Sequence, residues 1–271
     1  MNEIFNAKRF GKYFLYDLRN AKNNYWLSLL ICAGIPIISF ALVEIFAKLI
    51  DGNFIYAGLG TQIPALVTAY MIVILTFPVK AYGSVTDKRS GSAWLMLPAS
   101  PFEKWLSVIL ITCVILPVIF FALLFVAEAV LHLVFPGGWP VPAAQALGSF
   151  NDMVLSENGG LLSFNFPALA IYSWMENILV FTLGAMIFKK AKVGKTFLAV
   201  WVIGMAFSML TSVIFGVTAI SSDTIGEMFL DPEANPMKFV NFFNYFILGV
   251  CLLYILACAA GLYYRIKTLK H

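Results

Sequence analysis

The chain has 271 residues, of which 61% are hydrophobic and 12% are charged, and its formal net charge is +4. A soluble domain carries about 25% charged residues, so a chain this apolar has too few polar side chains to cover a surface that faces water. The mean hydropathy of +0.87 agrees with this, and together these values exclude a soluble globular protein. We therefore expect lipid to be the solvent of most of the chain.

Six apolar stretches are long enough to cross the hydrocarbon core as helices, which takes about 20 residues each. They lie near residues 26–47, 61–79, 105–135, 167–188, 196–220 and 239–264. These runs lack the alternation of polar and apolar residues that a spanning β-barrel needs. We therefore predict an all-α membrane protein with one six-helix transmembrane domain, residues 26–264. Pro36 and Pro117 should kink the first and third of its helices.

Basic residues are unevenly divided among the segments between these stretches. Sixteen of the eighteen Lys and Arg residues lie in alternate segments, namely residues 1–25, 80–104, 189–195 and 265–271. The other connections share only Lys48 and Lys238. Because Lys and Arg are enriched in cytoplasmic loops, the pattern predicts that both termini are cytoplasmic and that residues 136–165 form an external loop. The basic charge then contacts anionic membrane lipid, and no nucleic acid is expected as a partner.

The segment of residues 1–25 is too polar to be a span itself. Its apolar residues recur at helical spacing and its basic residues share another side: Phe10, Tyr13, Phe14 and Leu18 against Lys8, Lys12, Arg19 and Lys22. This pattern predicts an amphipathic helix that lies in the inner membrane interface. The helix serves either as a lipid anchor that orients the first span or as a lever that touches a cytoplasmic partner.

The connection of residues 80–104 is charged and contains glycine, yet it also holds the apolar patch Trp94–Leu97. After the patch, Ser100 and Glu103 have the spacing of a helix capping box, with Pro101 at the first helical position. The third helix should therefore begin here, before it enters the membrane. The apolar patch either folds back against the inner leaflet or docks into a groove on another protein.

This organisation resembles the permease subunit of a type-2 ATP-binding-cassette (ABC) exporter, which has six spans, both ends inside and a coupling element between the second and third spans. The stretch Ala93–Ser100 (AWLMLPAS), followed by Glu103 and Lys104, is similar to a signature of a bacterial subgroup of these permeases. The external loop 136–165 departs from that family, because it is longer than expected there.

The resemblance implies specific roles and partners. It implies that residues of the 80–104 connection couple to an ATPase: Asp87, Lys88, Arg89, Trp94, Leu95, Met96 and Leu97. It also implies a cytoplasmic ATP-binding subunit, a second permease subunit (a copy of this chain or a paralogue) that completes a dimer, and a place in the bacterial inner membrane. Export, in place of import, follows from the resemblance alone.

The chain has no GxxxxGK[ST] loop that would cradle phosphates, so we expect no cofactor in it, with ATP and Mg bound by the partner ATPase. Gly194-Lys195-Thr196 is only the tail of that pattern and lacks the upstream glycine. We therefore expect this chain not to be an enzyme. Closure of the partner ATPase would push on the coupling loop and switch the helices between two arrangements.

Four ionisable residues lie in or near the apolar stretches, where charge is costly. By their position in the stretches, Glu44, Glu128 and His132 should lie near the outer interface. Glu176 lies about nine residues into the fourth helix, roughly 13 Å deep at 1.5 Å per residue. Together with Asn177 it either forms a structural hydrogen bond to a neighbouring helix or lines a substrate pathway.

An intramembrane metal-dependent hydrolase is the alternative function, because Glu128 and His132 share a helix face at i, i+4 and would hold a metal together with Glu176. The chain has only two histidines, no HExxH motif and no serine elbow. Its four cysteines lie in apolar runs without metal-ligand spacing, and we predict no metal site. A membrane subunit of a transporter outside the ABC class is a further alternative.

Overall fold

The computed structural model describes residues 5–51, 59–134, 166–221 and 236–269. Within these ranges the chain is helical almost throughout and contains no strand. Six helical segments of the described ranges are long and apolar enough to cross a membrane. The prediction of an all-α, multi-pass membrane protein with six candidate spans is thereby confirmed. The loop that we expected to be external, residues 136–165, lies outside the described residues.

The first candidate span is built from two helices, α1 (Ala7–Ala33) and α2 (Ile35–Asp51). α1 continues past residue 25, where the sequence suggested that a separate interfacial helix would end. The interruption lies at Gly34, whose amide donates to the carbonyls of Leu30 and Ile31. Pro36 follows in the first turn of α2, a position that accepts proline because the amides there have no partner within the helix. The predicted kink is therefore the boundary between two helices.

The third candidate span is interrupted in a similar way. It consists of α5 (Pro101–Ile109), a π-helical turn (Leu110–Ile115) and α6 (Leu116–Val134). Pro117 is the second residue of α6, just after the π-helical turn, and local π-helical geometry is one way in which a spanning helix accommodates a proline. The whole segment has 34 residues. At 1.5 Å per residue it is about 50 Å long, so part of it is tilted or extends beyond a hydrocarbon core about 30 Å thick.

The remaining elements complete the chain. In order they are α3 (Leu59–Tyr82), a 3₁₀ turn (Gly83–Thr86), α4 (Lys88–Met96), α8 (Phe166–Ile187), α9 (Lys192–Ser221) and α11 (Pro236–Thr268). α8 and α9 are joined by a tight turn in which Ala191 has a left-handed backbone with φ 50°.

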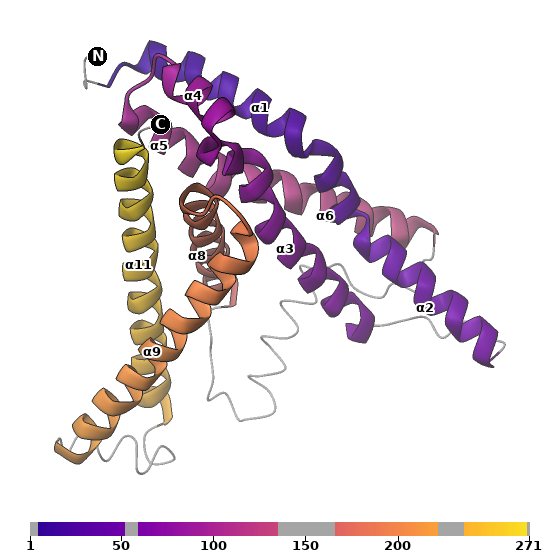
Figure 1. Ribbon diagram of the computed structural model, residues 1–271. Coiled ribbons are helices and arrows are strands. Elements are labelled where there is room, and N and C mark those ends of the chain that lie inside the picture. Colours follow the sequence, from indigo (N-terminus) through magenta and orange to yellow (C-terminus); the bar gives the residue numbers. More distant parts are fainter. Residues whose placement is uncertain (1–4, 52–58, 135–165, 222–235, 270–271) are drawn as a thin grey trace.

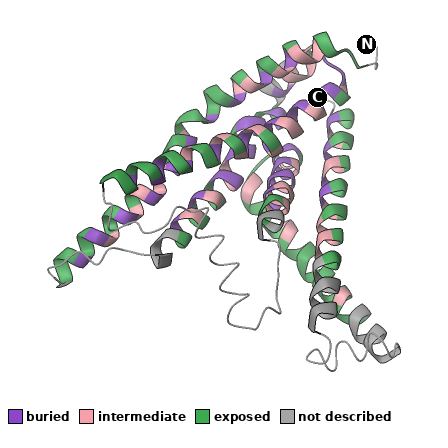
Figure 2. Cartoon of the chain, turned by 180° about the vertical axis from the view of Figure 1, so that it is seen from behind, coloured by how far each residue is buried: buried purple, intermediate pink, exposed green. Residues whose placement is uncertain are grey.

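α3 and α8 lie at the centre of the described helices. α8 packs against α3, α9 and α11, and α3 packs in addition against α1 and α2. The helices converge at the end where both termini lie and diverge towards the opposite end (Figure 1). Buried residues follow the faces that the helices turn towards one another (Figure 2), and one apolar cluster joins α1, α3, α5, α6, α8 and α11. α9 contributes little to it, since residues 201–210 are all exposed.

We call the end where the helices converge the basic end. It comprises the beginning of α1, residues 80–104, residues 189–195 and the last turn of α11. Hydrogen bonds connect these segments to one another or to the ends of the adjoining helices. These are the segments that carry most of the basic residues of the chain.

Basic side chains at this end cap the C-termini of neighbouring helices. Lys192 donates to the carbonyl of Gly83, the residue that follows α3. Arg265 Nε donates to the carbonyl of Met186 in the last turn of α8, at 3.0 Å. Lys104 does the same for α4, as described below. Cations in these positions satisfy carbonyls that the helix leaves unbonded and interact favourably with the negative end of the helix dipole.

Candidate functional site

The predicted element between the second and third spans is the short helix α4. Asp87 precedes it with an extended backbone, and Leu97 follows its last residue. The carbonyl of Asp87 accepts a hydrogen bond from the amide of Gly91 at 2.8 Å, and the Asp87 side chain is exposed. Lys88 and Arg89 belong to the first turn of α4, but their side chains lie outside the described residues.

The apolar patch Trp94–Leu97 has a buried side and an exposed side. Trp94 is partly buried and packs against the main apolar cluster. Leu95 and Leu97 are also partly buried, whereas the side chain of Met96 is 82% exposed. Trp94 therefore attaches α4 to the apolar core of this protein, a role that neither alternative for the patch included, whereas Met96 faces outward, where a partner or lipid can contact it.

Lys104 connects α4 to the start of the third span. Its side chain is buried, and its Nζ donates to the carbonyls of Trp94 at 2.9 Å and Leu95 at 3.3 Å. The same Nζ lies 4.6 Å from the centre of the Trp94 ring, a cation–π contact. Because one ammonium group binds both the backbone and the ring at the end of α4, the helix is held against α5.

Glu103 caps the helix that begins the third span. The predicted capping box is present: Ser100 Oγ accepts from the amide of Glu103 at 3.2 Å, and Glu103 Oε2 accepts from the amide of Ser100 at 2.9 Å. Pro101 occupies the first turn of α5, as the sequence predicted. The carboxylate lies at the N-terminus of α5, where the helix dipole favours negative charge.

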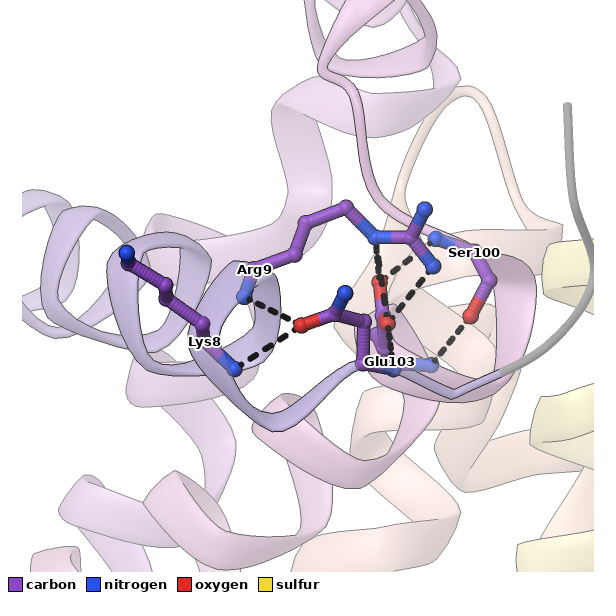
Figure 3. A network of polar contacts seen from close by, with 5 residues as sticks. Lys8, Arg9, Ser100 and Glu103 are labelled. Atoms are coloured by element: carbon purple, nitrogen blue, oxygen red, sulfur yellow. Dashed lines mark hydrogen bonds and ion pairs between the residues drawn. The ribbon is translucent and has the colours of Figure 1, made fainter.

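The same carboxylate holds the beginning of α1 (Figure 3). Arg9 donates to it from Nε and Nη2, at 2.8 Å to Oε2 and 2.7 Å to Oε1, and the amide of Asn6 donates to Oε1 at 3.0 Å. Asn6 is itself the N-cap of α1, since its Oδ1 accepts from the amides of Lys8 and Arg9. One fully buried carboxylate therefore joins the N-termini of α1 and α5. Sequence reasoning identified the cap but not this second role.

A second polar contact between α1 and α5 was also missed. Asp17 is 3% exposed and accepts a hydrogen bond of 2.6 Å from the hydroxyl of Ser107. A signal for its burial exists, because Asp17 falls on a stripe of residues at every fourth position that is buried along α1: Tyr13, Asp17, Ala21, Tyr25 and Leu29. The contacts of Glu103, Lys104 and Ser107 together make α1, α4 and the start of α5 one connected unit.

The intramembrane candidates Glu176 and Asn177 lie in the middle of α8. Asn177 donates to the carbonyl and hydroxyl of Ser173 one turn earlier, at 2.8 and 3.3 Å. The Ser173 hydroxyl also shares a hydrogen bond of 3.2 Å with the Tyr70 hydroxyl on α3. Asn177 thus belongs to a set of polar contacts between α8 and α3.

Glu128 and His132 lie on α6, which packs against α2. The Glu128 side chain is buried and that of His132 is exposed. In the described ranges, no group of three or more His, Cys, Asp and Glu side chains is placed to hold a metal ion. Glu128, His132 and Glu176 are therefore not brought together as the hydrolase alternative requires.

Comparisons with known proteins give no relative: no family model, no curated protein and no solved structure matches the chain.

Proposed function

We propose that this chain is the permease subunit of an ATP-driven ABC exporter and that α4 couples it to a separate ATPase. The observation that carries the proposal is the construction of α4. It is a short helix between two spans, it exposes Met96, and Lys104 fastens it to the helix that begins the third span. The AWLMLPAS stretch, which resembles the permease signature, forms the end of this helix and the link to α5.

The hydrogen bonds around α4 support a route for coupling. A push on α4 acts on Lys104, which is adjacent in the chain to Glu103, and Glu103 is bonded to Arg9 and Asn6 on α1. α1 continues into the first span and α5 into the third. Closure of the ATPase would thus move the first and third spans together, which is the kind of rigid displacement that alternating access requires.

The proposal also assigns an orientation and partners. The basic end faces the cytoplasm, as the positive-inside rule predicts, and the first part of α1 lies along the anionic inner leaflet of the bacterial inner membrane. The ATPase supplies the ATP and Mg sites. A second permease, either a copy of this chain or a paralogue, completes the translocation pathway.

Co-purification in mild detergent tests the docking assignment. We expect an ATPase to co-purify with the wild-type chain and to be lost from Met96→Glu, because Met96 is exposed and a charge there does not disturb packing. Gly194→Glu is the matched control, since it adds the same charge at an exposed position of the basic end away from α4. Trp94→Glu is a poorer test, because Trp94 is partly buried and packs against the core. Association that survives Met96→Glu would overturn the assignment.

A further inference from the structure

Six aromatic rings form a continuous row across α1, α5 and α11 at the basic end. The centres of neighbouring rings lie 5.5 to 6.0 Å apart, within contact distance for aromatic side chains, in the order Phe14, Phe10, Phe5, Phe102, Trp105 and Tyr263. We call these six residues the aromatic row. Because α1 runs obliquely to α11 (Figure 1), the row joins three separate parts of the chain at one end of the molecule.

The aromatic row has one side against the protein and one side open. Phe14 and Trp105 pack against the main apolar cluster, and the indole N–H of Trp105 donates to a backbone carbonyl of α11 at 2.8 Å. In contrast, Phe5, Phe102 and Tyr263 are 44%, 40% and 36% exposed. The described helices thus hold these rings in place but leave an aromatic surface uncovered. Such a surface is unfavourable in water, so we expect an apolar or interfacial partner to cover it.

The order of residues along α11 shows which partner this is. One exposed face of the helix, at spacings of seven, four, seven and four residues, carries in succession Tyr245, Leu252, Leu256, Tyr263 and Lys267. The two tyrosines are 18 residues apart, or about 27 Å at 1.5 Å per residue, close to the roughly 30 Å of a hydrocarbon core. No charged residue lies between them in the sequence. An apolar face with an aromatic residue at each end, followed by a lysine, is the pattern of a helix that crosses a bilayer.

The charges beside the row at the start of α1 agree with this. Lys8 and Lys12 are exposed and lie on the side of α1 opposite to Phe10 and Phe14. A helix with aromatic residues on one side and lysines on the other is suited to lie in the membrane interface. Its ammonium groups are complementary to the phosphates of phospholipids. Charge therefore favours lipid headgroups, in place of an apolar protein surface, as the cover of the row.

We infer that the aromatic row lies at the level of the phospholipid headgroups in the leaflet at the basic end, and that phospholipid covers its exposed rings. The ammonium groups of Lys8, Lys12 and Lys267 then lie among the lipid phosphates. Arg9 and Glu103 each adjoin a row residue in the sequence, so the junction of α1 and α5 lies at the same level. The inference rests on the membrane-spanning character of the chain and not on the proposed permease function. It adds α5 and α11 to the lipid contact proposed for α1.

Quenching of tryptophan fluorescence by brominated phospholipids tests the level of the row. The chain is reconstituted in lipids that carry bromine either just below the headgroup or near the end of the acyl chains. The emission lost in Trp105→Phe isolates Trp105, and we expect bromine near the headgroup to quench it several-fold more strongly than deep bromine. Trp201→Phe is the matched control, because Trp201 is 59% exposed and lies nine residues after Lys192, about 14 Å along α9. Its emission should show the opposite order. Equal or deeper quenching of Trp105, or none at either depth, overturns the inference.

A second measurement leaves all six rings in place. Spin labels are attached to α11 at exposed positions outside the row, through Leu253→Cys, Tyr264→Cys and Lys267→Cys in a chain whose four native cysteines are replaced by alanine. Collisions with oxygen, which concentrates in hydrocarbon, should dominate at position 253, and collisions with a water-soluble nickel chelate should dominate at position 267. Position 264, next to Tyr263, should lie between them. A label at 264 that matches either neighbour places the row outside the headgroup layer and overturns the inference. Failure of an ATPase to co-purify would overturn only the permease assignment.

Discussion

Arg9 on α1 and Glu103 on α5 are 94 residues apart in the sequence and form a two-point ion pair, with Nε 2.8 Å from Oε2 and Nη2 2.7 Å from Oε1. This is the fork geometry in which a guanidinium binds a carboxylate most specifically. The Glu103 side chain is fully buried and that of Arg9 is 28% exposed. Because a buried carboxylate is unfavourable without partners, the beginning of α1 is part of what allows α5 to start where it does.

Arg9→Gln should loosen the junction of α1 and α5. The variant loses the charge and the two-point geometry, so we expect a lower melting temperature in detergent and faster amide hydrogen exchange in the first turns of both helices. Arg9→Lys should restore only part of the melting temperature and of the protection from amide exchange, because an ammonium group cannot donate to both carboxylate oxygens in the two-point geometry of a guanidinium. Lys12→Gln is the control, as Lys12 is exposed on the same helix. Equal effects at positions 9 and 12 would show that the pair contributes nothing.

Lys104→Met should separate docking from coupling. The variant keeps an apolar stem of similar length but leaves the carbonyls of Trp94 and Leu95 without their donor. We expect faster amide exchange along α4, with ATPase association retained and the stimulation of ATP hydrolysis by the permease reduced. Lys195→Met, at an exposed position of the same end, should change none of these. If amide exchange along α4 is faster but the permease still stimulates ATP hydrolysis as the wild type does, the coupling route through Lys104 is contradicted.

Sequence reasoning succeeded where the determining forces are local. The spans follow from the length of each apolar run, and the capping box of Ser100 and Glu103 follows from a spacing of three residues that directly satisfies two backbone amides. The predicted end of the interfacial helix at residue 25 was less accurate. It was placed where the sequence changes from polar to apolar. Helical hydrogen bonding does not require apolar side chains, so α1 continues until Gly34 and Pro36 interrupt it.

The contacts that assemble the candidate site could not be predicted in the same way. Nothing near Arg9 in the sequence indicates that its partner is Glu103, since the pair depends on how α1 lies across α5. For Asp17, the four-residue spacing of the stripe indicates burial, but its partner Ser107 depends in the same way on how α1 packs against α5. Long-range packing of helices decides both contacts.

Gly184→Ala should disturb the packing of α8 against α9. A Cβ at this position would lie 1.9 Å from Oγ1 and 2.7 Å from Cβ of Thr196, and both residues are buried. Overpacking of this kind typically costs about 1–3 kcal/mol, so we expect a lower melting temperature. The double variant Gly184→Ala/Thr196→Gly should recover much of the loss. Gly204→Ala is the control, because a Cβ there meets nothing within 4 Å. A neutral Gly184→Ala would mean that the two helices pack farther apart.

Ser107→Ala should destabilise the protein through Asp17. The Asp17 carboxylate is 3% exposed, and the Ser107 hydroxyl donates to it at 2.6 Å. Removing the donor leaves a buried acceptor unsatisfied, which typically costs about 1–3 kcal/mol. In an Asp17→Leu background the same change removes no such bond, so the free energy of unfolding should then fall much less. A double-mutant cycle measured by denaturation in detergent gives the difference between the two backgrounds. Ser208→Ala, at an exposed position on α9, should have little effect in either background. If Ser107→Ala costs the same with and without Asp17, the hydrogen bond between α1 and α5 is not what stabilises this junction.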